Sequence, residues 1–116
     1  LNEIKNKNLQ ENAQRTGSYL KNELKKLSKK YPIIGDVRGR GLFLGLELVD
    51  KNLNPEARKA VYLVNRMKEL GVLMSNDGID KNVIKIKPPL IFSIEDSKKL
   101  IILLEKVFAE NFMASD

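Results

Sequence analysis

The sequence predicts a small α+β domain, in which a long N-terminal helix precedes a mostly antiparallel sheet of three or four strands with helices packed on one face. Three observations lead to this fold class. Helical hydrophobic spacing occurs at both ends and in the middle of the chain, alternating segments lie between these regions, and the connections are short, which favours antiparallel neighbours. We therefore expect the order helix, two strands, helix, two strands, helix.

The first predicted helix covers about residues 2 to 29. Gly17 interrupts it at a cost of about 1 kcal/mol relative to alanine, which indicates either close packing at that point or a helix that begins later. Pro32 ends the helix, because proline lacks an amide hydrogen. We assign residues 1–30 to this helix and 31–116 to the sheet and its helices, within one structural domain. The buried stripe is predicted from spacings of three and four: Leu9, Ala13, Thr16, Leu20, Leu24 and Leu27.

Two strands are predicted next, at residues 33–37 and 42–49. Gly39 and Gly41 lie at the tight reversal between them, where a positive φ or a close backbone approach is needed. Gly45 lies within the second strand and indicates a bulge or another element that presses on the backbone. Alternation in the second strand places Leu42, Leu44, Leu46 and Leu48 on one face and Phe43, Gly45 and Glu47 on the other.

The middle helix is expected to begin at Asn54, whose side chain suits a cap, with Pro55 in the first turn and Glu56 near the positive end of the helix dipole. Gly71 suits the left-handed position that follows a helix. The buried stripe is predicted to consist of Ala57, Ala60, Val61, Val64 and Met67.

Residues 72–75 and 83–87 are predicted strands, joined by a segment with turn chemistry and ended by Pro88 and Pro89. Ser93 and Asp96 have the spacing of a capping box ahead of the last helix. The tail, residues 111–116, is expected to fray. The core positions of the last helix are Leu100, Leu103, Leu104, Val107 and Phe108.

Composition excludes several classes of function. The chain has 116 residues without cysteine or histidine, which removes disulfides, thiolate nucleophiles, the commonest metal ligand and the commonest general base. No carboxylate, lysine, tyrosine or serine spacing indicates an assembled catalytic site. No apolar run is long enough to span a bilayer and no signal peptide is recognisable, so we expect a cytoplasmic protein with no metal and no membrane partner.

The net charge of +6 and the pI of about 9.6 could indicate a polyanionic partner. The lysines are spread over solvent faces of the predicted helices, as in residues 21–30, which favours a solvated surface and no nucleic acid. The glycine-rich segment 35–41 leads into a strand, whereas a phosphate-binding loop leads into a helix N-terminus.

The segment YPIIGDVRGRGLFLGLELV, residues 31–49, resembles the start of the C-terminal small domain in class III, ornithine-aminotransferase-like, pyridoxal-phosphate enzymes. Residues 69–107, including the strand that ends in KPPL, are similar to the rest of that domain. Residues 8–27 resemble the long helix that connects the large domain to the small one. The form LMSNDGIDKNVIKIKPPL, residues 73–90, looks most like the branch of alanine-glyoxylate aminotransferase 2-like proteins and of phospholyases that act on ethanolamine phosphate or phosphohydroxylysine.

The resemblance implies an enzyme whose Schiff-base lysine, pyridine-pairing aspartate and phosphate-binding residues lie in a large domain, because no segment of this chain matches those motifs. It implies amino transfer between an amino acid or amine and an oxo acid, or phospholyase chemistry. The chain would then be a C-terminal fragment, inactive alone, with no catalytic or cofactor-binding residue of its own. Pyridoxal phosphate would belong to the full-length enzyme, with the large domain, a second subunit and a small amine or amino acid substrate as partners.

Lys85 is the leading candidate for substrate contact. The resemblance places it, just before IKPPL, where family members often carry an arginine that reaches the active-site mouth. A lysine there would bind a carboxylate or phosphate as a point charge. The alternative is a solvated lysine beside Lys87. Arg38 is the second candidate for substrate contact, but pairing with an acid or capping a helix of the large domain is the favoured role. Glu47 is expected to be a surface charge or an interdomain partner.

Two functions of other classes remain open. A free-standing basic module could bind RNA through its sheet, although an aromatic content of 6% leaves few side chains to stack on bases. A small regulatory or dimerisation domain is the other. An isolated small domain would expose the apolar surface that meets its large domain, so we expect self-association through the first helix.

Overall fold

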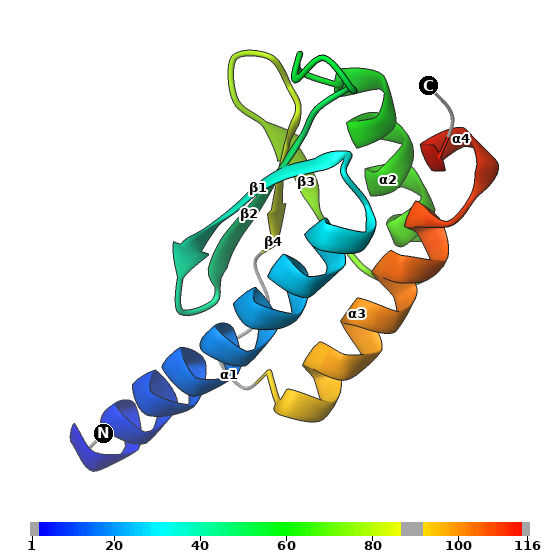
Figure 1. Ribbon diagram of the computed structural model, residues 1–116. Coiled ribbons are helices and arrows are strands. Elements are labelled where there is room, and N and C mark those ends of the chain that lie inside the picture. The colour runs from blue at the N-terminus through cyan, green and yellow to red at the C-terminus, as the bar shows by residue number, and fades with distance from the viewer. Residues whose placement is uncertain (1–2, 87–91, 115–116) are drawn as a thin grey trace.

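The computed structural model describes residues 3–86 and 92–114 (Figure 1). These residues confirm the α+β class and the predicted order, and they add a short helix at the C-terminal end. The predicted strand end at Pro88 and Pro89 lies outside the described residues. The elements are α1 (Glu3–Lys30), β1 (Ile34–Arg40), β2 (Phe43–Leu48), α2 (Ala57–Glu69), β3 (Ser75–Asp77), β4 (Val83–Ile86), α3 (Ile94–Phe108) and α4 (Asn111–Ala114).

The sheet has the strand order β1-β2-β4-β3, and every neighbouring pair is antiparallel. The helices α1, α3 and α2 lie on one side of it, as predicted, with α3 in contact with both of the others (Figure 1). The opposite sheet face carries no helix within the described part of the chain. No helix in that part is long and apolar enough to cross a membrane.

Alternation in the strands separates a buried face from an exposed one. The leucines of β2 are buried as predicted, whereas Phe43 on its other face is 76% exposed. Ile84 and Ile86 of β4 point into the core, and Lys85 between them is exposed. The fully buried centre of the domain joins all three long helices to the sheet through Leu20, Leu24, Leu46, Leu48, Leu63, Met67, Ile84, Leu104 and Val107.

The helix α1 packs against the β1–β2 hairpin at Gly17, which confirms the interpretation of that glycine as a site of close packing. A Cβ atom at Gly17 would lie 1.9 Å from the carbonyl oxygen of Gly41. One turn further along α1, Lys21 Nζ donates a hydrogen bond of 2.9 Å to the carbonyl oxygen of Gly39. The long helix is therefore fixed to the hairpin by a backbone contact and by a hydrogen bond.

Two predictions for the middle helix are wrong. The N-cap of α2 is Glu56, and its side chain makes no capping hydrogen bond. Asn54 is held in the preceding loop instead, where its backbone N–H donates to Asp50 Oδ1 at 2.9 Å. This contact, together with a second one from Asn52, lowers the pKa of Asp50. Val61 is 46% exposed, because the buried stripe runs through Ala60, Leu63 and Met67.

Three further predictions for local structure need correction. The third strand covers Ser75–Asp77 and not residues 72–75, because its partners for hydrogen bonding are the residues of β4 from Val83 to Lys85. The irregularity in the β1–β2 register lies between Ile34 and Asp36, so Gly45 is neither a bulge nor part of a turn. The tail does not fray up to Ala114, since α4 buries Met113 against the core.

A cluster of polar and aromatic side chains holds α4 to α2. Arg66 donates two hydrogen bonds to the Glu110 carboxylate, from Nε to Oε1 at 3.0 Å and from Nη2 to Oε2 at 2.7 Å. The Tyr62 hydroxyl donates to Oε1 of the same carboxylate at 2.5 Å. The Phe112 ring packs on the Tyr62 ring at 4.7 Å between centroids. Arg66, and then Tyr62, lower the pKa of Glu110 to about 2 from the usual value of 4.5. The loop after α3 is thus tied to the middle helix by a charge-assisted contact.

This contact makes stability depend on pH in a defined window. Because the pKa of Glu110 is depressed in the folded chain, its contribution is present above about 4.5 and is lost as the pH falls towards about 2. We expect Glu110→Gln to flatten the fall of the thermal unfolding midpoint across this window. The control is Glu95→Gln, an exposed acid that pairs within α3. Equal pH slopes for the wild type and Glu110→Gln would contradict the prediction.

Candidate functional site

Arg38, Gly45 and Lys85 form one row across the open face of the sheet. Arg38 of β1 is paired with Gly45 of β2, and Gly45 is paired with Lys85 of β4. Directly paired residues of antiparallel strands project to the same side, so the two cationic side chains flank the glycine. The structure therefore brings the two predicted substrate-binding candidates together on the face that the helices leave open.

A groove of about 630 Å³ lies over this row. Its floor is the backbone of β2 around Gly45, its sides are the cations, and Phe43 and Val83 give it an apolar border. The residues that line it are Arg38, Gly39, Phe43, Leu44, Gly45, Gly78, Val83, Lys85 and Ile86. A cavity of this size with convergent polar groups suits a small ligand or part of one.

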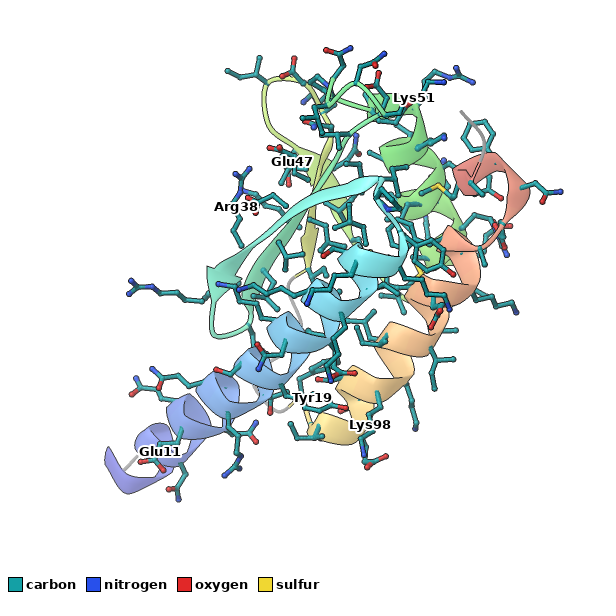
Figure 2. The ribbon with its side chains drawn as sticks, in the orientation of Figure 1. Glu11, Tyr19, Arg38, Glu47, Lys51 and Lys98 are labelled. Carbon is teal, nitrogen blue, oxygen red and sulfur yellow. The ribbon has the colours of Figure 1, made fainter. Side chains whose placement is uncertain are left out.

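Arg38 is oriented by two carboxylates. Its guanidinium lies 3.4 Å from Asp36 on the same strand and 3.3 Å from Glu47 on β2. Arg38 and Glu47 extend together on the side of the sheet that faces away from the helices (Figure 2). The expected acid pairing of Arg38 is present within this chain, and Glu47, at 34% side-chain exposure, is one of its partners. Such exposed pairs add little stability, so their main effect here is to orient the guanidinium.

Lys85 differs from Arg38 in having no ion-pair partner among the residues that the structure describes. Its side chain is exposed in the centre of the sheet, on β4, between β2 and β3. A lysine in this position can bind an anionic group as a point charge without breaking an internal contact. Lys87, its predicted neighbour on the same strand face, lies outside the described residues.

Sequence reasoning did not place Phe43, Val83 and Gly78 at this site. Gly39 was predicted at the reversal between the strands; it has a positive φ of +127° but lies in β1, paired with Leu44, whereas Gly41, with a φ of +53°, lies in the turn. The missed residues come from β2, from β4 and from the segment between β3 and β4, which meet through the β2–β4 and β3–β4 registers. Their only sequence signal was the predicted outward position of Phe43. The local spacing of hydrophobic residues does not predict the register between strands that lie 40 residues apart in the chain.

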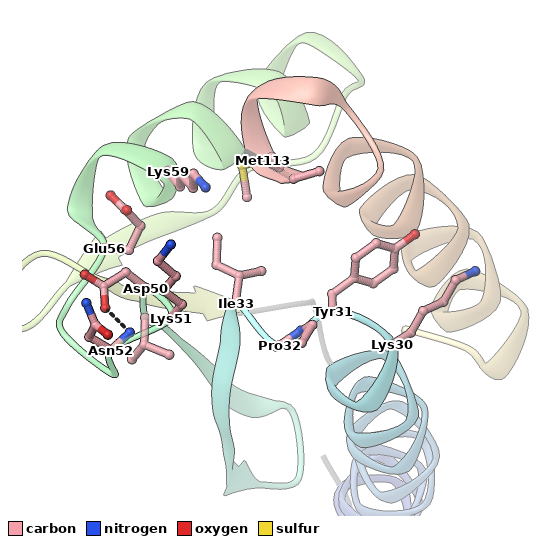
Figure 3. Close-up of a pocket in the computed structure, with 12 residues that line it drawn as sticks. Lys30, Tyr31, Pro32, Ile33, Asp50, Lys51, Asn52, Glu56, Lys59 and Met113 are labelled. Carbon is pink, nitrogen blue, oxygen red and sulfur yellow. Dashed lines mark hydrogen bonds between the residues drawn. The ribbon is translucent and has the colours of Figure 1, made fainter. Parts of the chain in front are cut away.

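A second cavity, of about 550 Å³, lies at the other end of the domain, between the end of α1, the loop after β2 and α4 (Figure 3). Ile33 and Met113 contribute to its apolar wall. Its polar groups serve local structure: Asp50 accepts from the Asn52 backbone N–H at 2.8 Å, and Lys30 pairs with Glu105. Lys51 and Lys59 also have interaction partners. The sheet groove is therefore the better candidate site.

The geometry defines a class of protein: an α+β domain whose helices cover one sheet face and whose other face carries a cationic groove. The family model for class III aminotransferases matches residues 1–108, and the chain belongs to this family. The chain is 50% identical over 103 residues to alanine-glyoxylate aminotransferase 2 homolog 2, mitochondrial, from Arabidopsis thaliana, covering 87% of this chain and 22% of the relative. It is 38% identical to ethanolamine-phosphate phospho-lyase homolog 1 from Caenorhabditis elegans, covering 90% and 23%.

Solved structures support the same family. A phospholyase from Arthrobacter in complex with phosphoethanolamine superposes with a TM-score of 0.87 at 34% identity, over 92% of this chain and 26% of that one. An amine transaminase from an uncultivated Pseudomonas species, in the form with pyridoxal phosphate bound as an internal aldimine, has a TM-score of 0.78 at 31% identity, over 91% and 24%. The chain thus spans about a quarter of the length of these relatives.

The described residues do not fit pyridoxal phosphate as a group held by this chain alone. The cofactor needs an enclosed place for its ring and donors for its phosphate, and the groove lies on an open strand face. The N-terminus of α3 is closed by the predicted capping box, with bonds of 3.0 Å in both directions between Ser93 and Asp96. The same contact lowers the pKa of Asp96.

Proposed function

We propose that this chain forms the C-terminal small domain of a larger pyridoxal-phosphate enzyme of class III, and that its open sheet face forms one wall of the substrate site. The observation that carries the proposal is the row of Arg38, Gly45 and Lys85 on the face that no helix covers. Residues 1–30 act as the connecting helix and residues 31–116 as the small domain. The length of the relatives, about four times that of this chain, supports a further domain.

In this proposal the groove binds and orients, and the bound cofactor, held elsewhere, supplies the electron sink. Lys85 contacts an anionic group of the substrate, either a carboxylate or a phosphate. Arg38, oriented by Asp36 and Glu47, lines the same groove and offers N–H donors, while the two carboxylates offset its charge. Neither residue takes part in the bond-breaking step, so both are binding residues.

The reaction proposed first is amino transfer between an amino acid or amine and an oxo acid. Elimination of phosphate from ethanolamine phosphate or a similar substrate is the alternative, favoured by the names of the Caenorhabditis and Arthrobacter relatives. The RNA-binding alternative gains no support, because Phe43 is the one aromatic side chain on the open sheet face within the described residues.

The partners proposed for the chain are the large cofactor-binding domain of the same protein and a second subunit. The isolated chain is proposed to be inactive, to bind no cofactor and to self-associate through α1. We place the whole protein in the cytoplasm, although the Arabidopsis relative is named mitochondrial.

The proposal is tested by comparing the whole gene product with the 116-residue chain. The whole protein is expected to show a visible absorbance band with pyridoxal phosphate that borohydride reduction removes, and mass analysis is expected to place the reduced lysine outside this chain. The chain alone is expected to give no stoichiometric adduct. One adduct at a single lysine of the chain would overturn the proposal, and so would a whole protein that binds no cofactor.

The choice between the two reactions follows from the products. An aminotransferase forms a new amino acid from an added oxo acid, whereas a phospholyase releases inorganic phosphate from ethanolamine phosphate. Incubation of the whole protein with both kinds of substrate, followed by detection of each product, distinguishes them.

A further inference from the structure

Gly45 has a position that the fold alone does not explain. Its φ does not fall in the left-handed region, and it lies in a regular stretch of β2 that is paired on both sides. A Cβ atom there would lie 3.6 Å from Val83 Cγ1 and 3.8 Å from the carbonyl oxygen of Ile84, which are ordinary contacts. Glycine in a strand interior lowers stability relative to alanine. Neither backbone geometry nor packing therefore requires glycine at this position.

The position of Gly45 in the groove gives a reason for the missing side chain. Two strand spacings separate Arg38 from Lys85, so their Cα atoms lie about 10 Å apart. A side chain at position 45 would project into the space between the two cations. Without one, a small anionic group has room to approach the sheet between the guanidinium and the ammonium group.

The anion-binding capacity of this space comes from the Lys85 ammonium group and from the N–H donors of Arg38, whose charge Asp36 and Glu47 offset. The Arg38 guanidinium is oriented by Asp36 and Glu47 and retains further N–H donors, since each carboxylate accepts from one terminal nitrogen. Lys85 has no ion-pair partner in the described part of the chain. The groove therefore contains the Lys85 ammonium group, without a counter-charge in the described part of the chain, on one side of Gly45. The planar guanidinium of Arg38, a hydrogen-bond donor, lies on the other side.

We propose that Gly45 is the floor of an oxyanion subsite between Arg38 and Lys85, and that its missing side chain sets the size of the group that enters. The identity of the ligand as the carboxylate or phosphate of a substrate rests on the proposed function. The geometry of the subsite belongs to this chain alone.

The test is a titration of the 116-residue chain with inorganic phosphate, and in parallel with acetate, followed by amide chemical shifts of β2 and β4. The wild-type chain is expected to give saturable shifts that centre on Gly45 and Lys85. Gly45→Ala is expected to weaken phosphate binding severalfold, and Gly45→Val by about tenfold or more, as for the loss of a charge-assisted contact. Tighter binding of phosphate than of acetate indicates a phosphorylated ligand, and the reverse order a carboxylate.

Two controls separate the subsite from general charge and from folding. Lys85→Gln removes a cation of the subsite and is expected to abolish the shifts, whereas Lys25→Gln, an exposed position on α1, makes the same charge change and is expected to leave them unchanged. The thermal unfolding midpoint of Gly45→Ala is expected to equal or exceed that of the wild type.

Unchanged phosphate affinity in both Gly45 variants would overturn the inference, as would a wild-type chain without saturable shifts. These results leave the cofactor experiment on the whole protein unaffected, so a failure of the subsite and a failure of the proposed function are distinguishable.

Discussion

Replacement of Gly17 by alanine is expected to lower the free energy of unfolding of this chain by about 2 kcal/mol, although alanine is the better helix former. The added Cβ atom would lie 1.9 Å from the oxygen, 2.3 Å from the carbonyl carbon and 2.8 Å from the Cα atom of Gly41. All three are backbone atoms, so no change of rotamer relieves the contact, and α1 must move away from the hairpin.

The magnitude follows from two opposing effects. Alanine in a helix interior gains about 1 kcal/mol over glycine. Overpacking against a fixed backbone costs up to about 3 kcal/mol and in some cases more. The loss exceeds the gain because the separation of α1 from the hairpin also stretches the hydrogen bond from Lys21 to Gly39.

Urea denaturation of the variant beside Ser18→Ala measures this effect. Ser18 is the exposed neighbour in the same helix, so its replacement gives the benefit of alanine without the contact. We expect Ser18→Ala to be neutral or slightly stabilising. A Gly17→Ala chain that is as stable as Ser18→Ala would show that α1 does not pack on the hairpin as described.

The elements with strong local signals were predictable from the sequence. The stripe of α1, the alternation of β2 and the capping box of α3 depend on residues close together in the chain, and all three are confirmed. The failures involve interactions that the local patterns did not reveal. The backbone N–H of Asn54 donates to Asp50 within the same loop, so Asn54 does not cap α2, and α4 is ordered by the contact of Glu110 with Arg66, 44 residues away.

For the candidate site, too, single residues were predictable from the sequence, whereas their arrangement in space was not. The resemblance to the family singled out Lys85, and the glycine turn drew attention to Arg38, but neither pattern placed the two on either side of Gly45. That placement depends on the β1–β2 and β2–β4 registers, and a shift of one residue in either would send one cation to the buried face. Gly45 was predicted as a bulge or a site where another element presses on the backbone, and the register shows no bulge there. The role proposed for it as space for a ligand has the same local sequence signal as a glycine that bends a strand.

The hairpin that carries Arg38 provides the other large effect, since Gly39→Ala is expected to lower the free energy of unfolding by about 3 kcal/mol. Gly39 has a φ of +127°, a conformation that costs a residue with a side chain about 1–2 kcal/mol or more. In addition, its Cβ atom would lie 2.0 Å from the carbonyl oxygen of Phe43 on the neighbouring strand β2. Strain and overpacking therefore add at this position.

Gly41 is the matched control, because it lies two residues further along, in the turn that follows β1, and also has a positive φ, of +53°. A Cβ atom at Gly41 meets nothing within 4 Å, so Gly41→Ala is expected to cost only the conformational strain of about 1 kcal/mol. Urea denaturation of both variants compares their free energies of unfolding, and equal losses of free energy would contradict the prediction.

Because Arg38 precedes Gly39 and is paired with Gly45, a hairpin opened at Gly39 also displaces one cation of the groove. Phosphate binding is therefore expected to weaken in Gly39→Ala and to persist in Gly41→Ala.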